Sequence, residues 1–188
     1  EDLVDDIDTR AAALPNEAEL RREKEEIRGV GDTVDVALLV AAHRSGVVHE
    51  ELRARYPLVK RIPYEPDLKY AASFHRHEEK RAVVAFAKGA PETLIAMASR
   101  MDVGGALAPI DRETLWRQKD EMSAKGLRVL AFAEGEVTPE PEHGYGASHL
   151  QNLVFLGLVG MQDPLRPEVR LAIARCRDAG IAVAMVTG

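Results

Sequence analysis

The stretch Ala87-Lys88-Gly89-Ala90-Pro91-Glu92 joins a strand-like run, residues 81–86, to a helix-like run, residues 93–101. Pro91 suits the first position of a helix, where its missing N–H costs no hydrogen bond, and the glutamate after it complements the helix dipole. Lys88 would then lie beside the free N–H groups of a helix start, a combination that can hold a phosphate or another polar ligand group. An ordinary strand-to-helix connection with a surface lysine fits these six residues equally well.

The composition indicates a folded chain with a packed core. Of its 188 residues, 46% are hydrophobic and 30% are charged, and the net charge of −6 argues against a general nucleic-acid binder. Cys176 is the one cysteine, which excludes a disulfide framework or a cysteine-rich metal site within the chain, and it is expected to be a small core residue. No apolar run approaches the length of a membrane span, so the chain is expected to be soluble.

Helical signals dominate the region before residue 56. Residues 1–28 predict one or two short helices broken at Pro15, and a turn cluster follows at 28–33. Asp32 or Thr33 can cap an almost wholly apolar helix over 34–43, which should therefore be buried. Asp35, in the first turn of that helix, is by itself best explained as a surface acid that compensates the helix dipole. A short helix is predicted over 50–55.

The next region predicts strands: 58–62, then a turn over 63–67, then 69–75, with a hairpin loop over 77–80 leading into 81–87. Four side chains around the loop could be pictured as metal ligands, but a hairpin position favours solvent exposure, and no metal site is predicted. They are His75, His77, Glu78 and Glu79.

After the helix over 93–101, the pattern predicts a loop over 102–109 and a helix from Asp111 to Lys125, closed by Gly126. The side chain of Trp116, on that helix, is expected to be buried in the hydrophobic core. A strand over 127–133 carries the lone cation Arg128, and residues 134–149 have the composition of a link between domains.

The last part of the chain predicts a strand–helix–strand unit of a parallel sheet. Residues 153–161 are continuously apolar, as in a strand buried on both faces, a helix follows from Pro167 to Gly180, and 181–186 form the second strand. Because chemistry collects at the carboxyl ends of parallel strands, Asp163 and Thr187 are candidate site residues. The expected division is one domain over 1–149 and part of another over 150–188.

Six stretches, in family order, resemble the cytoplasmic part of a P-type cation-transporting ATPase of the calcium, sodium–potassium and proton pump branches. Residues 30–39 resemble its GxxxExALL helix, 62–69 its PFxxxxK segment, and 87–92 match its KGAPE motif. Residues 126–131 resemble GLRxLA, 157–169 resemble GxxGxxDPPRxEV, and 185–188 look like the start of TGD. The resemblance implies an α+β nucleotide-binding domain, a twisted antiparallel sheet flanked by helices, followed by a partial α/β haloacid-dehalogenase-like βαβ unit.

By this resemblance the chain binds ATP. Tyr64 takes the place of the phenylalanine that stacks on adenine, and Lys88 closes the other side of the pocket. Asp35 stands where the family has a longer glutamate that binds the adenine amino group. The remaining nucleotide-binding positions that the resemblance implies are Lys69, Gly89, Arg128, Thr187 and Gly188.

The resemblance also implies a parent protein that is a cation pump driven by ATP and Mg²⁺. This chain would be a cytoplasmic portion of that integral membrane protein and would work with its remaining phosphorylation, actuator and membrane domains. No DKTGT string occurs, so the phosphorylated aspartate is absent and Asp163 and Thr187 form an incomplete catalytic set. The fragment is expected to bind adenine nucleotide weakly without hydrolysing it through an aspartyl phosphate. Two alternatives stay open: a soluble haloacid-dehalogenase-type phosphatase and a stand-alone nucleotide-binding module.

Overall fold

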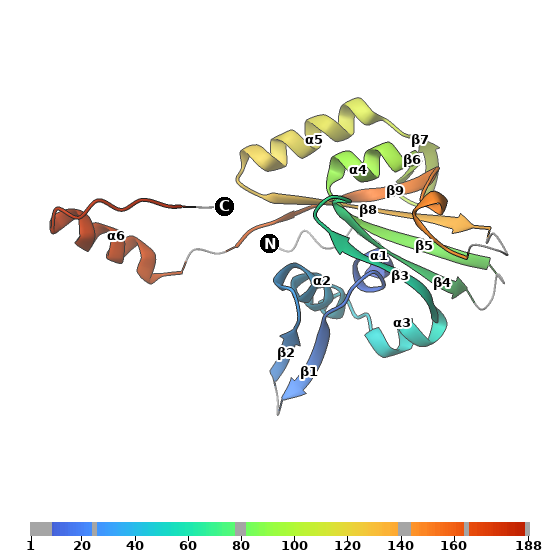
Figure 1. Cartoon of the computed structure of the whole chain (residues 1–188), viewed down its shortest axis with the longest axis horizontal. Coiled ribbons are helices and arrows are strands. Elements are labelled where there is room, and N and C mark those ends of the chain that lie inside the picture. The colour runs from blue at the N-terminus through green and yellow to red at the C-terminus, as the bar shows by residue number, and fades with distance from the viewer. Residues whose placement is uncertain (1–8, 24–25, 78–81, 139–143, 164–165, 187–188) are drawn as a thin grey trace.

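The fold is built on one mixed sheet. The computed structural model describes residues 9–23, 26–77, 82–138, 144–163 and 166–186. Among these residues, seven strands pair in the order β3-β4-β5-β8-β9-β6-β7 (Figure 1). Neighbours are antiparallel except β6 and β9, which are parallel, so the α+β prediction is confirmed with a mixed sheet. The strands are β3 Leu58–Glu65, β4 Tyr70–His77, β5 Ala82–Gly89, β6 Ala98–Val103, β7 Ala106–Pro109, β8 Arg128–Val137 and β9 Leu153–Met161.

Helices cover both faces of this sheet, as Figure 1 shows. On one face lie α4 (Pro91–Met97) and α5 (Arg112–Ala124), and on the other α1 (Thr9–Ala13), α2 (Thr33–Arg44) and α3 (His49–Arg55). Strand β5 separates the two cores by simple alternation. Ala85 and Ala87 pack in the core under α4 and α5, while Val84 and Phe86 pack in the core with α1 and α2. The next even position, Lys88, therefore faces α1 and α2.

Helix starts and stops follow the local sequence signals. The Asp32 side chain accepts a hydrogen bond from the backbone N–H of Val34 (2.9 Å) and so caps α2. The Asp111 side chain accepts from the N–H of Thr114 (3.1 Å) at the start of α5. Beyond the end of α5, Gly126 has φ +78°, a left-handed conformation that favours glycine. These predicted helices are confirmed within a residue or two at their ends.

Four predicted segments are wrong in their secondary structure. Part of the helix expected over 1–28 is a separate antiparallel hairpin of β1 (Glu19–Glu23) and β2 (Glu26–Val30). Helix α4 stops at Met97, and the residues up to 109 form β6 and β7 instead of a helix end and a loop. Strand β3 continues to Glu65, so the turn expected over 63–67 begins only at residue 66. In each case a partner strand supplies backbone hydrogen bonds that override weak local propensities.

Three single-residue predictions are also wrong, again because tertiary packing decides burial. Trp116 is 37% exposed, with the Lys119 ammonium 5.8 Å from its ring centre, so it lies at the surface of α5. Cys176 is half-buried on α6 (Glu168–Asp178), a helix with no buried residue. His75 is buried on β4, and both of its ring nitrogens are hydrogen-bonded. His77 is partly buried, while Glu78 and Glu79 lie outside the described residues.

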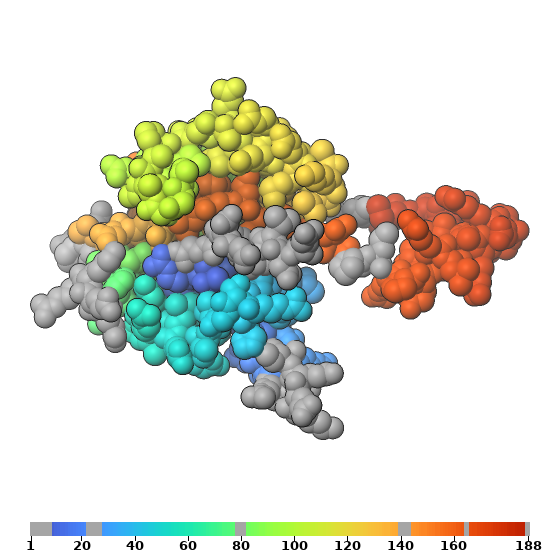
Figure 2. Space-filling view, turned by 180° about the vertical axis from the view of Figure 1, so that it is seen from behind, coloured from blue at the N-terminus to red at the C-terminus, as the bar shows by residue number. Residues whose placement is uncertain are grey.

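The expected strand–helix–strand unit is not confirmed by the residues that the structure describes. Its first strand, β9, pairs with β8 and β6 and so is part of the large sheet. Part of the expected link is also strand, because β8 continues to Val137, before a 3₁₀ turn at Ala147–His149. Residues 181–186 are described but form no strand, and Met185 is 90% exposed. In Figure 1 and Figure 2, α6 and the segment after it stand away from the sheet.

Crossing a bilayer would take a longer and more apolar helix than any that the described part of the chain contains.

Candidate functional site

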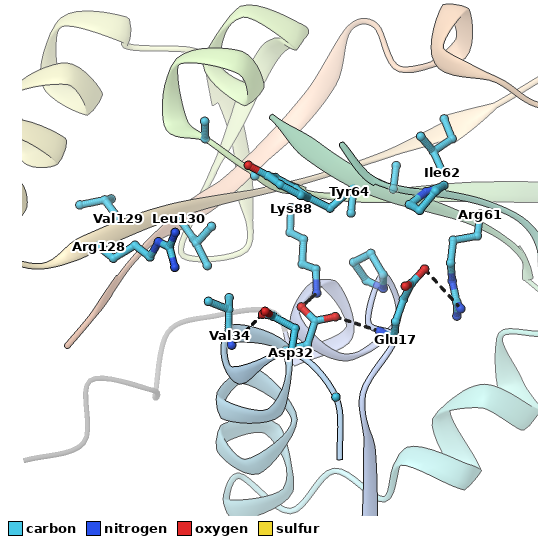
Figure 3. A pocket seen from close by; sticks show the side chains of 18 residues that line it. Glu17, Asp32, Val34, Arg61, Ile62, Tyr64, Lys88, Arg128, Val129 and Leu130 are labelled. Carbon is cyan, nitrogen blue, oxygen red and sulfur yellow. Dashed lines mark hydrogen bonds and ion pairs between the residues drawn. The ribbon is translucent and has the colours of Figure 1, made fainter. Parts of the chain in front are cut away.

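A cavity of about 600 Å³ lies between the sheet and the N-terminal end of α2 (Figure 3). This volume is in the range of pockets that hold small-molecule ligands. Its walls come from the loop before β1, the start of α2, and strands β3, β4, β5 and β8, so distant segments converge on it. The lining residues are Pro15, Glu17, Gly31, Asp32, Val34, Asp35, Arg61, Ile62, Pro63, Tyr64, Ala71, Ala72, Lys88, Gly89, Ala90, Arg128, Val129 and Leu130.

Lys88 crosses from the sheet to α2. Strand alternation points its side chain toward α2, and its Nζ donates to Oδ1 of Asp35 at 2.5 Å. The two side chains are 8% and 14% exposed, so this ion pair is largely shielded from water. Burial lowers the pKa of Lys88, and the hydrogen bond and charge of Asp35, with weaker contributions from Asp32 and Glu17, oppose that shift.

Asp35 is therefore not a free surface acid at a helix start. Besides the Lys88 ammonium on Oδ1, its Oδ2 accepts the backbone N–H of Glu17 at 3.0 Å. Its own carbonyl accepts the Nδ2 of Asn16 at 2.8 Å. The dipole-compensating interpretation misses these three partners because they come from two distant parts of the chain.

Tyr64 lies on the edge strand β3 and is 61% exposed while lining the cavity. Figure 3 shows its ring beside the base of the Lys88 side chain, both carried by the sheet, with Asp32 and Glu17 across the cavity. An exposed aromatic ring at the wall of a cavity is a surface on which a planar ligand can stack. The cavity thus combines a ring, an ammonium and several carboxylates.

Two arginines add positive charge at the walls. Arg128 has the same parity on β8 as Leu130 and Phe132, which pack in the α1–α2 core, so it faces the same side as Lys88. Arg61, on β3, has its Nη1 3.8 Å from a carboxylate oxygen of Glu17. Sequence reasoning found Arg128 but missed Arg61 and Glu17. No local signal marks this pair, because the fold of the N-terminal segment creates the contact.

The structure explains why position 89 is a glycine, because a larger residue has no room there. A Cβ at this position would collide with the carbonyl oxygen of Lys69 and lie 2.7 Å from Cα of Tyr70. The N–H of Ala90 donates to that same Lys69 carbonyl at 2.9 Å. The N–H of Ala90 is therefore used within the fold and is not among the free N–H groups expected beside Lys88.

The structure brings together some of the expected site residues and not others. The cavity is lined by Asp35, Tyr64, Lys88, Gly89 and Arg128. Lys69 is exposed at the turn before β4, with φ +59°, and does not line the cavity. Asp163 is exposed in the loop after β9 and does not line it either. Thr187 and Gly188 lie outside the described residues.

The donor set suits a polar organic ligand better than a metal ion. Within the described ranges, no group of three or more His, Cys, Asp and Glu side chains is placed to hold a metal. In the cavity, the ammonium of Lys88 already neutralises Asp35.

Comparison with known proteins identifies the chain's relatives. Residues 9–168 match the family model described as P-type ATPase, cytoplasmic domain N. The chain is 36% identical over 177 residues to a cation-transporting ATPase, pma1, of a Synechocystis strain, covering 93% of the chain and 19% of that protein. It is 32% identical over 195 residues to a sodium/potassium-transporting ATPase alpha subunit of Artemia franciscana (95% of the chain, 20% of that protein). A calcium-transporting ATPase of Bacillus subtilis is 30% identical over 183 residues (94% and 20%). The chain spans about a fifth of the length of these curated relatives.

Proposed function

The chain belongs to the P-type ATPase family, whose cytoplasmic domain N it matches, and on that premise we propose that it binds ATP in the cavity between β3, β5 and the start of α2. We further propose that it serves an ATP-driven cation transporter in which the bound γ-phosphate passes to an aspartate that this chain does not contain. The remaining phosphorylation, actuator and membrane domains of that transporter would be its partners.

The observation that carries the nucleotide proposal is that Tyr64 and Lys88, from separate strands, line one cavity of suitable volume. The adenine ring would lie between the exposed face of Tyr64 and the aliphatic stem of Lys88. Stacking of a base on an aromatic side chain contributes about 1–3 kcal/mol. The carboxylate of Asp35, at the end of that stem, is an acceptor for the exocyclic amino group of adenine.

Charge favours one direction for the phosphates. Glu17 and Asp32 line the cavity and repel a polyphosphate, while Arg128 attracts it. The triphosphate would therefore run toward the β8 side of the cavity and would bring its Mg²⁺ with it. Lys69, outside the cavity lining, is not included among the proposed contacts.

The phosphatase alternative is not favoured. It needs a parallel sheet with a nucleophile at a strand end, whereas β9 lies in a mixed sheet, antiparallel to β8 and parallel to β6. It also leaves the cavity at Lys88 without a role.

We propose that the chain alone forms no aspartyl phosphate, since DKTGT does not occur in it. Incubation with γ-labelled ATP should leave no acid-stable protein-bound label, and a labelled aspartate would contradict this.

Titration of the ¹⁵N-labelled chain with ATP, followed by amide chemical shifts, tests the nucleotide site. Shifts should concentrate at Asp35, Tyr64, Lys88 and Arg128. Lys88→Ala should weaken binding by about tenfold or more, because it removes the stem that faces adenine and leaves the Asp35 carboxylate without its charged partner, a loss of about 1.5–3 kcal/mol. Lys60→Ala is the matched control, since Lys60 is exposed on β3 and does not line the cavity. Shifts confined to other regions, or equal losses in both variants, would overturn the proposal.

A further inference from the structure

Asn16 lies in the loop between α1 and β1 and is completely buried. Its Oδ1 accepts the backbone N–H of Ala18 at 2.9 Å, which closes a turn around the loop. Its Nδ2 donates to the carbonyl of Ala12 at 3.3 Å and to the carbonyl of Asp35 at 2.8 Å. One amide thus ties the end of α1, its own loop and the first turn of α2 together. Burying an amide is costly unless its groups are paired, and here both amide hydrogens and the oxygen are used.

This tie fixes both oxygens of the Asp35 carboxylate. Because the Asn16 loop is fastened to α2, the N–H of Glu17 meets Oδ2 of Asp35 at 3.0 Å. The other oxygen, Oδ1, is left to receive Lys88 Nζ. The carboxylate is therefore held from the loop on one side and engages the sheet lysine on the other. Asn16 itself does not line the cavity, so its effect on a ligand is indirect, through Asp35 and through the lining residues Pro15 and Glu17 on either side of it.

We infer that Asn16 is a positioning residue that sets the place of the Asp35 carboxylate and, through it, of the Lys88 ammonium in the cavity. The inference rests on the proposed function, because the cavity is the proposed ATP site. In this arrangement the main role of Asp35 is to hold the Lys88 ammonium in place, and its contact with adenine is secondary. By fixing Asp35, Asn16 keeps the Lys88 ammonium at the far wall of the cavity, so that the aliphatic stem of Lys88 is stretched across it and can face the purine.

Other charges act on Lys88 and must be held constant in a test. From the α2 side Asp35 and Asp32 face it, and from the loop Glu17 does. Arg61 and Arg128 line the same cavity with positive charge. Asn16→Ala changes none of these charges. A change in the pKa of Lys88 on that substitution therefore reports a change in the position of the carboxylates that the Asn16 loop holds, Asp35 by hydrogen bond and Glu17 by charge.

A double-mutant cycle tests the inference. The Kd for ATP is measured by calorimetry for wild type, Asn16→Ala, Lys88→Ala and the double variant. Asn16→Ala should weaken ATP binding by about tenfold in the wild type and by clearly less once Lys88 is removed, since only the contact of Asp35 with adenine is then left to lose. Equal losses in both backgrounds, or no loss in either, would mean that Asn16 only supports the fold and would overturn the inference.

A second readout needs no nucleotide. The pKa of the Lys88 ammonium, followed by NMR of labelled lysine side chains, should fall in Asn16→Ala because Asp35 no longer holds the charged form in place. An unchanged pKa would contradict the inference. If wild type does not bind ATP, the proposed function fails, while this pKa still decides whether Asn16 positions the pair.

A backbone variant covers the case in which Asn16→Ala does not fold. Glu17→Pro removes the N–H that Asp35 accepts, and an Asn-Pro sequence is compatible with the turn that Asn16 closes. It is compared with Glu17→Ala, which also lacks the carboxylate but keeps the N–H. The proline variant should show the lower Lys88 pKa and the weaker ATP binding of the two. Equal values in the two variants would count against the inference.

Discussion

Tyr64→Ala should separate ligand binding from stability more cleanly than any other change at the cavity. The ring is 61% exposed on an edge strand, so its removal takes away little buried surface. Surface substitutions of this kind usually change the free energy of unfolding by less than about 0.5 kcal/mol. The same ring would supply the stacking face for adenine. Its loss should cost about 1–3 kcal/mol of binding free energy.

At about 1.4 kcal/mol per factor of ten, this loss corresponds to a Kd for ATP that is about 5- to 150-fold higher. Calorimetric titration gives the Kd, and urea unfolding of the same samples gives the stability. Tyr64→Phe keeps the ring and should bind ATP nearly as the wild type does. The control is Leu107→Ala, because Leu107 is 57% exposed on β7, at the opposite edge of the sheet.

The reasoning is refuted if Tyr64→Ala binds ATP as tightly as the wild type while folding normally. It is equally refuted if Leu107→Ala weakens binding as much, since the loss would then not come from stacking at the cavity. A fall in stability of several kcal/mol in Tyr64→Ala would show that the ring is not exposed as described.

Two further predictions concern the sheet beneath the cavity. Burial lowers the pKa of His75 from 6.5 to about 4, so between these values the unfolded chain binds a proton that the native chain does not. This group's stabilisation is complete above pH 6.5 and decreases as the pH falls toward 4, by about 2 kcal/mol between pH 7 and 5 at about 1.36 kcal/mol per pKa unit. Urea unfolding of wild type and His75→Gln across this range should show the steeper decline in the wild type, and equal slopes would contradict it. Gly89→Ala places a Cβ 2.7 Å from Cα of Tyr70 and should destabilise the fold by about 1–3 kcal/mol in urea unfolding. Gly146→Ala, where nothing lies within 4 Å of the added Cβ, should not, and equal losses would rule out the collision as the cause.

Local chemistry was enough to predict several elements. Asp32 starts α2, and Asp111 and Gly126 bound α5, because caps and left-handed glycines act over only a few residues. The alternating and apolar runs of β4, β5 and β9 were likewise visible as strands. The ordered motifs from residue 30 onward indicated the P-type ATPase family, which the family match confirms.

Pairing between strands was decided only by the tertiary structure. Strands β6 and β7 form a hairpin where the local pattern favoured the end of a helix and a loop, and β1 and β2 pair where it favoured helices. Strand β9 joins the large sheet, although its pattern favoured a separate unit. Strand hydrogen bonds connect residues far apart in sequence, so no local propensity encodes which partner a segment will find.

The cavity shows the same division between sequence and structure. By itself the sequence determined that Lys88 and Asp35 are chemically notable, one in a motif after a strand and the other in the first turn of a helix. Only the folded chain decided that they form a shielded ion pair across 53 residues, with the N–H of Glu17 on the other carboxylate oxygen and the Asn16 amide on the backbone carbonyl of Asp35. The physical reason is that burial and charge pairing depend on which surfaces the sheet and α2 bring together, and that arrangement exists only after the core has packed.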